Sequence, residues 1–141
     1  MKVLHTIAEF RAARAAFPGG FGFVPTMGAL HEGHLTLVRR AKAECGACAV
    51  SIFVNPTQFN NPDDLKKYPR TLERDIDLLE GAGCDILFLP EPGEIYPPGY
   101  KASHYELGML DQVLEGKFRP GHFQGVCQVV DILLNVTQPD C

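Results

Sequence analysis

The sequence has no hydrophobic run long enough to cross a membrane. It contains no stretch of about 18 consecutive apolar residues, the shortest run that predicts a membrane-spanning helix. Its N-terminus also lacks the long apolar core and small-residue cleavage site of a secretory signal peptide. We therefore expect a cytoplasmic protein.

The sequence also lacks an excess of basic residues. It has 13 Lys and Arg against 17 Asp and Glu, which gives a net charge of −4. Proteins that bind duplex nucleic acid usually carry a basic face, so we expect neither nucleic acid nor a membrane as a partner. Internal repeats, low-complexity tracts and domain linkers are absent from the sequence as well.

Cysteine is too scarce and too irregularly spaced to predict a disulfide framework. The five cysteines are odd in number, and without a signal peptide reduced thiols are the default expectation. Cys45 and Cys48 form a C-x-x-C pair at the end of a predicted helix. A redox pair normally has its first cysteine at a helix N-terminus, where the helix dipole lowers the thiol pKa. No second such pair is present to complete a zinc site, so we interpret the pair as core packing.

What the sequence does contain is enough apolar material for one domain. It has 141 residues, of which 45% are hydrophobic. A chain of this size can bury a hydrophobic core without the support of disulfide bonds. Short apolar runs predict buried strands over 21–24, 48–54 and 85–89. Helical spacing predicts helices over 34–45, 71–80, 104–114 and 124–136, and a first one from a capping box at Thr6 and Glu9 that carries Ile7, Phe10 and Phe17 on one face. This alternation predicts an α/β fold, a Rossmann-like parallel sheet with helices on both faces.

The loop after the first predicted strand has the composition of a phosphate site. It opens a helix, and a helix N-terminus offers free N–H groups and partial positive charge to an anion. Gly28 and Gly33 let a ligand approach the backbone. His31 and His34 are three residues apart, so they share a face if the helix begins near them. There they could donate hydrogen bonds to a triphosphate and stabilise the charge that develops as pyrophosphate leaves. The alternatives are a metal site, for which no third ligand is obvious, and two solvated histidines without a role.

A second polar loop follows the next predicted strand. Ligands of parallel α/β folds bind at the carboxyl ends of the strands, where Asn55 and Gln58 are predicted to lie. An amide both donates and accepts hydrogen bonds, which suits a small ligand with hydroxyl and carboxylate groups. A capped, self-bonded turn is the alternative. Tyr68, Arg70 and Arg119 add further donors, although an isolated arginine often forms only a structural ion pair.

Together these segments resemble the pantoate–β-alanine ligase (pantothenate synthetase) family, whose Rossmann-like nucleotidyltransferase core is shared with the class I aminoacyl-tRNA synthetases. The resemblance runs through nearly the whole chain and in the order of the family. The matching stretches are 24–34 (VPTMGALHEGH), 51–59 (SIFVNPTQF), 68–75 (YPRTLERD), 95–99 (IYPPG), 119–126 (RPGHFQGV) and 138–140 (QPD).

The resemblance implies an ATP-dependent ligase of pantothenate and coenzyme A biosynthesis, using ATP and Mg²⁺. Pantoate attacks the α-phosphate of ATP to give pantoyl adenylate and pyrophosphate. The amine of β-alanine then attacks the acyl carbon and releases pantothenate and AMP. Members of the family are typically homodimers, so a homodimer is implied here as well.

The resemblance also assigns residues by position. His34 is implied as the proton donor and His31 as the second catalytic histidine of an HxGH motif. Gln58 corresponds to the glutamine that contacts pantoate and lies near β-alanine. The residues implied to line ATP are Met27, Gly28, Ala29, Leu30, His31, Glu32, Gly33 and His34. Those implied to form an apolar wall around pantoate are Pro25, Met27, Phe53, Val129 and Val130. Polar residues implied at the β-alanine approach are Asn55, Tyr68 and Arg119.

The sequence also departs from the family. In the family, Gln-Pro-Asp leads into another strand, a Gly-x-Lys-Asp-x-x-Gln-Gln motif, a Met-Ser-x-Arg loop and a C-terminal domain. These are absent from the 141 residues, and Ile132 stands where the family often has Lys. We therefore expect residues 1–141 to be a truncated N-terminal ATP- and pantoate-binding domain without its C-terminal domain. Little or no ligase activity is expected, since losing even one stabilising donor costs about 10²–10³-fold in rate. The rivals are another nucleotidyltransferase with the same histidine loop and a non-catalytic binding or interaction module.

Overall fold

The described part of the chain forms one parallel sheet. The computed structural model describes residues 1–56, 62–68, 71–101, 105–107 and 122–141. The four strands run in the order β1-β4-β3-β2, and every neighbouring pair is parallel. Their bounds are β1 (Lys2–Leu4), β2 (Gly22–Thr26), β3 (Cys48–Ile52) and β4 (Ile86–Phe88). The three predicted strands correspond to β2, β3 and β4, so the predicted parallel α/β fold is confirmed.

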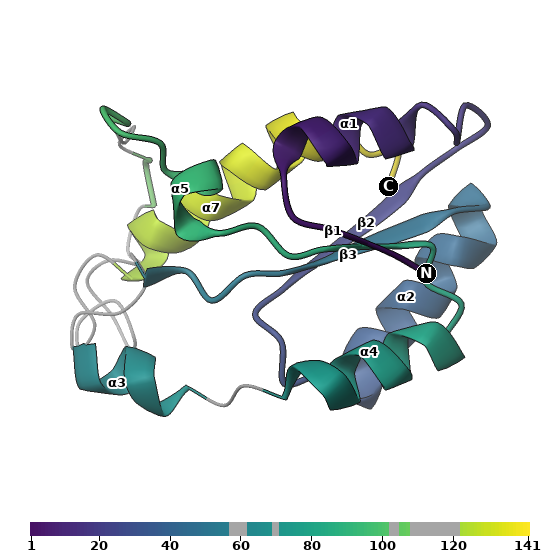
Figure 1. Ribbon diagram of the computed structural model, residues 1–141, viewed down its shortest axis with the longest axis horizontal. Coiled ribbons are helices and arrows are strands. Elements are labelled where there is room, and N and C mark those ends of the chain that lie inside the picture. Colours follow the sequence, from purple (N-terminus) through teal and green to yellow (C-terminus); the bar gives the residue numbers. More distant parts are fainter. Residues whose placement is uncertain (57–61, 69–70, 102–104, 108–121) are drawn as a thin grey trace.

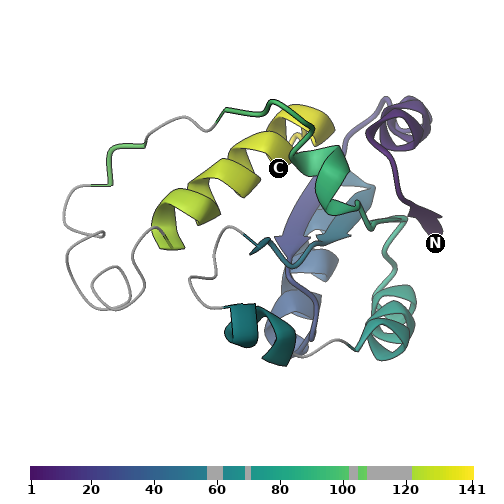
Figure 2. The ribbon, with the colours of Figure 1, turned by 60° about the vertical axis from the view of Figure 1, so that its left-hand side comes forward.

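Helices cover both faces of this sheet (Figures 1 and 2). On one face lie α1 (Ile7–Arg14), α5 (Pro92–Ile95) and α7 (His122–Thr137), packed around a cluster that includes Phe10, Phe88 and Leu133. On the other face lie α2 (Glu32–Cys45) and α4 (Leu72–Gly81), whose cluster includes Val38 and Leu79. The remaining helix, α3 (Pro62–Lys67), buries none of its residues. Because β3 lies between two helical layers, its residues need to be apolar on both sides.

Local capping explains where the helices begin and end. Thr6 Oγ1 accepts a hydrogen bond from Glu9 N at 3.1 Å, and Glu9 Oε1 accepts one from Thr6 N at 3.1 Å. This confirms the predicted capping box, which satisfies two N–H groups at the start of α1. At the C-terminal end of α2, Gly46 has a φ of 79°. Glycine adopts this left-handed conformation without a steric penalty, so it ends the helix before β3.

Three sequence predictions about the secondary structure need correction. Strand β1 was not predicted, because it is three residues long and largely exposed, and so has no apolar signature. Phe17 lies beyond α1, which ends at Arg14, although its side chain still packs against the core. Of the helix predicted over 104–114, residues 105–107 are described and are not helical. Both backbone polar groups of Tyr105 instead bond the amide of Gln124, at 2.9 and 2.7 Å. Residues 104 and 108–114 lie outside the described ranges.

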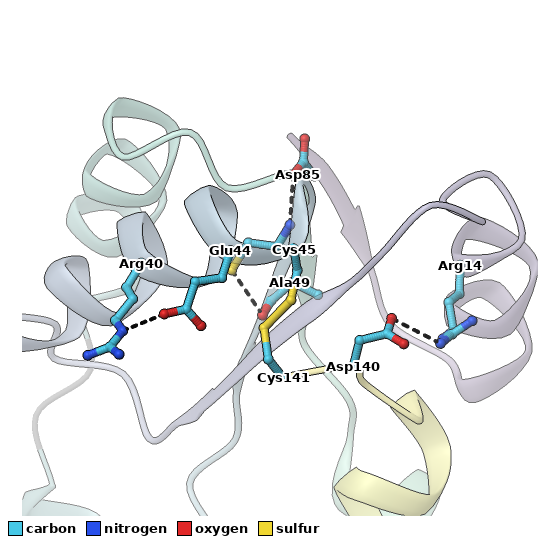
Figure 3. Close-up of a disulfide and its surroundings, with 9 residues drawn as sticks. Arg14, Arg40, Glu44, Cys45, Ala49, Asp85, Asp140 and Cys141 are labelled. Carbon is cyan, nitrogen blue, oxygen red and sulfur yellow. Dashed lines mark hydrogen bonds and ion pairs between the residues drawn. A yellow bond between two sulfur atoms is a disulfide. The ribbon is translucent and has the colours of Figure 1, made fainter.

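The expectation of reduced thiols is also wrong in this structure. Cys45, at the end of α2, forms a disulfide with Cys141, 96 residues away (Figure 3). The prediction could not find this pair, because only the fold brings the end of α2 beside the last residue of the chain. Cys48, in contrast, is a free and fully buried thiol. The interpretation of the C-x-x-C pair as core packing therefore holds for Cys48 alone.

Residues 140 and 141 run along the edge of the sheet that β2 forms. Asp140 N donates to Phe21 O at 2.7 Å, and Phe23 N donates to Cys141 O at 2.8 Å. On the neighbouring helix α1, the Arg14 guanidinium donates to the carbonyl oxygens of Thr137 and Gln138 at 2.8 and 2.6 Å. These contacts satisfy the end of α7 and hold that helix against the sheet.

Candidate functional site

The histidine loop (residues 27–34) leaves β2 through a tight, left-handed turn. Thr26 Oγ1 accepts a hydrogen bond from Gly28 N at 3.1 Å and donates to Ser51 O, on β3, at 2.8 Å. Gly28 has a φ of 81°, and a Cβ at this position would lie 3.1 Å from Ile52 Cγ2. Glycine is therefore needed at residue 28 both for its backbone conformation and for space.

The two histidines form the start of α2. His31 is the N-cap: its Nδ1 accepts from Gly33 N at 3.1 Å, while His34 Nδ1 accepts from His31 N at 3.1 Å. The two ring centroids are 4.0 Å apart. A Cβ on Gly33 would lie 2.9 Å from His31 Cε1, so the glycine between the histidines leaves room for the ring.

These hydrogen bonds determine which nitrogen of each neutral ring carries the proton. An Nδ1 that accepts from a backbone N–H carries no proton, so we assign the proton of each neutral ring to Nε2. Burial lowers the pKa of His34, the neighbouring His31 lowers it further, and the Asp75 carboxylate opposes both effects. His34 is therefore neutral near pH 7 and can donate one hydrogen bond through Nε2.

An apolar cavity of about 310 Å³ lies at the carboxyl ends of β2 and β3, beside α7. The structure brings together in it every residue that the resemblance implied for the pantoate wall, and His34 and Tyr68 add polar groups to its lining. Burial raises the pKa of the Tyr68 hydroxyl, with a smaller contribution from Asp75, so Tyr68 is a neutral donor. The lining residues are Pro25, Thr26, Met27, Gly28, His34, Phe53, Tyr68, Val126, Val129, Val130 and Leu133. Their role in ligand binding stays a prediction.

Asn55 faces the protein interior rather than a cavity. It is 0% exposed, its Nδ2 donates to Gly125 O at 3.0 Å, and its Oδ1 accepts from the Tyr96 hydroxyl at 2.8 Å. The amide thus connects the end of β3 to α7 and to the segment after α5. Gln58, Arg70 and Arg119 lie outside the described residues, and their predicted contacts stay predictions.

A second cavity, of about 520 Å³, lies at the carboxyl ends of β3 and β4. Met27, Gly28 and Phe53 line both cavities, so the two cavities are neighbours. The other lining residues of the second cavity include Leu72, Asp75 and Pro90.

Sequence reasoning missed Asp75. Its carboxylate is 1% exposed and accepts hydrogen bonds from Ala29 N at 3.0 Å and from Leu30 N at 2.9 Å. An aspartate in the first turn of a predicted helix usually interacts with the helix dipole and solvent. No signal in the sequence other than the matching stretch 68–75 pointed to it.

Within the described ranges, no group of three His, Cys, Asp or Glu side chains is arranged to hold a metal ion. None of the described helices is long and apolar enough to span a membrane.

Comparisons with known proteins agree with this geometry. The sequence model of the family described as pantoate-beta-alanine ligase matches residues 2–141. The pantothenate synthetases of Chloroflexus aurantiacus and Gluconobacter oxydans are each 58% identical over 139 residues, which is 99% of this chain and 49% and 50% of theirs.

Solved structures of the same family share the fold. The pantothenate synthetase of Thermus thermophilus matches 99% of this chain and 50% of its own, with a TM-score of 0.88 and 51% identity. The pantoate-beta-alanine ligase of Francisella tularensis, crystallised with beta-gamma ATP and beta-alanine, matches with a TM-score of 0.92 and 45% identity, over 99% of this chain and 54% of its own. The chain thus spans about half the length of the relatives it matches. By sequence and by fold, this chain belongs to the pantoate–β-alanine ligase family.

Proposed function

We propose that this chain provides the pantoate pocket and part of the ATP site of a ligase that joins pantoate to β-alanine. The observation that carries the proposal is the apolar cavity beside the start of α2. Its wall of Pro25, Phe53 and Val130 is matched to a branched aliphatic acid, and His34 at its edge belongs to the helix N-terminus that would bind phosphate.

In the first step, a carboxylate oxygen of pantoate attacks the α-phosphorus of ATP. The bond from that phosphorus to the oxygen bridging to the β-phosphate breaks, and pyrophosphate leaves. The negative charge on the leaving group increases as this bond breaks. The Nε2–H groups of His31 and His34 and the partial positive charge at the N-terminus of α2 are what this chain offers to stabilise that charge.

In the second step, the amine of β-alanine attacks the acyl carbon of the adenylate. The bond from that carbon to the AMP oxygen breaks, and the amine nitrogen loses a proton to the solvent. Adenylation is needed because a free carboxylate is a poor electrophile, whereas AMP is a good leaving group. The crystallised Francisella tularensis relative, complexed with beta-gamma ATP and beta-alanine, supports both ligands for this chain.

Magnesium is expected to arrive with the nucleotide. Mg²⁺ usually keeps several waters and binds through substrate phosphates and one or two carboxylates. The described residues fit that pattern better than a dedicated cage, since none of them form a three-ligand cluster. In this proposal Mg²⁺ is part of the ATP substrate.

The pantoate pocket is tested by isothermal titration of the 141-residue chain with pantoate and with 2,4-dihydroxybutyrate, which lacks the two methyl groups. Burying two methyl groups contributes about 1.6 kcal/mol, so we expect pantoate to bind about tenfold more tightly. Equal affinity for the two acids, or no binding of either, would refute the pocket assignment.

A pair of variants on α7 locates the pocket. Val130→Ala removes part of the cavity wall and should weaken pantoate binding by about fivefold, the effect of about 1 kcal/mol. Leu134, on the same helix, is 45% exposed and does not line the cavity, so Leu134→Ala is the matched control and should leave the affinity unchanged. ATP–pyrophosphate exchange in the presence of pantoate then distinguishes a chain that forms the adenylate from one that only binds.

A further inference from the structure

A buried carboxylate underlies the histidine loop. Asp75, in the first turn of α4, is 1% exposed, and its two oxygens accept hydrogen bonds from consecutive loop amides. Burying a charged carboxylate is costly unless hydrogen bonds compensate it. The compensation comes from the loop, from the Thr71 hydroxyl at 3.2 Å and from the Arg74 guanidinium at 4.0 Å.

The amides that Asp75 holds belong to a strained part of the loop. Ala29 has a φ of 51°, in the left-handed region that non-glycine residues seldom adopt. Such a conformation costs about 1–3 kcal/mol and persists only where the surroundings enforce it. Asp75 Oδ2 enforces it at Ala29 N, and Oδ1 does so at the next amide.

Arg74 also contacts this turn, through a backbone carbonyl oxygen rather than an N–H group. Its Nη1 donates to Leu30 O at 2.9 Å, while the carboxylate of Asp75 accepts from Leu30 N. Two adjacent residues of α4 therefore satisfy both backbone polar groups of Leu30, the residue immediately before the N-cap His31. Because Leu30 directly precedes the N-cap, its backbone conformation determines where α2 begins and where the two imidazoles point.

We propose that Asp75, assisted by Arg74, is the positioning residue of the histidine loop: it holds residues 29 and 30 so that the N-terminus of α2 and the His31–His34 pair face the ligand. This inference rests on the proposed function of the loop as part of the ATP site. Asp75 itself contacts neither histidine ring by a hydrogen bond, and so acts through the backbone.

The charge of Asp75 has a second effect, on His34. The carboxylate favours the protonated ring, against burial and the neighbouring His31, which both lower its pKa. Removing the charge should therefore lower the pKa of His34 further. This titration tests whether the charge of Asp75 acts on His34. Amide exchange at Ala29 and Leu30 tests the hold on the loop, which a residue that served only to pack α4 would leave unchanged.

The test compares Asp75→Asn with Asp77→Asn in the full 141-residue chain. Asp77 is exposed on the same helix, so it is the matched control. Asparagine can present one oxygen but must turn its NH₂ group toward the other loop N–H, which breaks one of the two hydrogen bonds. We expect faster amide hydrogen exchange at Ala29 and Leu30, a lower His34 pKa by NMR, and about tenfold weaker binding of MgATP, with wild-type values for Asp77→Asn.

Arg74→Ala keeps the test decisive if Asp75→Asn does not fold. The Arg74 side chain is 60% exposed, so its removal should leave the melting temperature near that of the wild type. Losing its bond to Leu30 O should still weaken MgATP binding by about fivefold, the effect of about 1 kcal/mol.

Two outcomes would overturn the proposal. One is wild-type exchange at Ala29 and Leu30 in a folded Asp75→Asn chain, which would show that Asp75 does not hold the loop. The other is unchanged MgATP affinity in Arg74→Ala and in any folded Asp75→Asn chain. If the wild-type chain binds no MgATP, the proposed function fails instead, and amide exchange at Ala29 and Leu30 alone decides whether Asp75 positions the loop.

Discussion

Replacing Asn55 by alanine should destabilise the protein, because Asn55 connects elements that are distant in the sequence. Its amide accepts a hydrogen bond from the Tyr96 hydroxyl and donates one to Gly125 O, with distances of 2.8 and 3.0 Å. Asn55 is 0% exposed and Gly125 is buried, so water cannot easily replace the lost groups. The substitution takes one hydrogen-bond partner from each neighbour and leaves a small cavity.

The magnitude follows from the loss of two hydrogen bonds and of the packing of a buried side chain. The two lost hydrogen bonds contribute about 1 kcal/mol each and the small cavity costs about 1 kcal/mol more, so Asn55→Ala should lower the free energy of unfolding by about 3 kcal/mol. An unfolding entropy of about 2.1 cal/mol/K per residue over 141 residues converts this into a fall of about 10 °C in melting temperature. Tyr96→Phe removes one of the two bonds and should cost about half as much.

The assay is urea unfolding followed by circular dichroism, for both single variants and the double variant. The two residues are in contact, so the double variant should be more stable than the sum of the single effects implies. Asn135→Ala is the control: Asn135 is exposed on α7 and bonds Asp131 O at 2.9 Å, and its loss should cost at most about 0.5 kcal/mol. An Asn55→Ala chain as stable as the wild type would refute this reasoning, and the predicted contact of Asn55 with β-alanine stays a separate prediction.

Three further predictions concern other parts of the fold. With Cys45 and Cys141 joined, the chain unfolded without reductant should show three reactive thiols out of its five cysteines, and a count of five would contradict the structure. Arg14→Ala should lower the free energy of unfolding by about 1–3 kcal/mol, because the guanidinium bonds two carbonyl oxygens at the end of α7; an unchanged urea midpoint would contradict this. Ser51→Ala should leave stability unchanged or raise it slightly, since the buried Ser51 hydroxyl has no hydrogen-bond partner among the described residues. A loss above about 1 kcal/mol on urea unfolding would show that the hydroxyl is bonded.

Local signals in the sequence predicted a large part of this fold. The apolar runs located β2, β3 and β4, and the capping box at Thr6 and Glu9 located the start of α1. The histidine loop was recognisable because glycine and histidine occupy positions where geometry requires them. Gly28 needs a positive φ, and Gly33 leaves space for the His31 ring.

The errors have a common physical origin, since each depends on contacts between distant segments. Strand β1 exists because Lys2–Leu4 pairs with Ile86–Phe88, and three exposed residues show no periodicity. The disulfide joins cysteines 96 residues apart. Residues 105–107 are not helical where Tyr105 bonds the amide of Gln124.

The sequence by itself determined the class of fold and the position of the histidine loop, because these follow from local backbone geometry and from the periodicity of apolar residues. The residues of the pocket wall were implied by the resemblance to the family. Only the tertiary structure decided which polar groups are buried and what they bond. Asp75 resembles a surface carboxylate in the sequence, but α4 packs it beside the loop. The Asn55 amide bonds α7, which the sequence did not indicate, and its contact with a ligand stays a prediction. The role of such a polar side chain cannot be assigned from the sequence alone, because its partners are distant along the chain. The loop amides lie 46 and 45 residues away from Asp75, and Gly125 lies 70 residues away from Asn55.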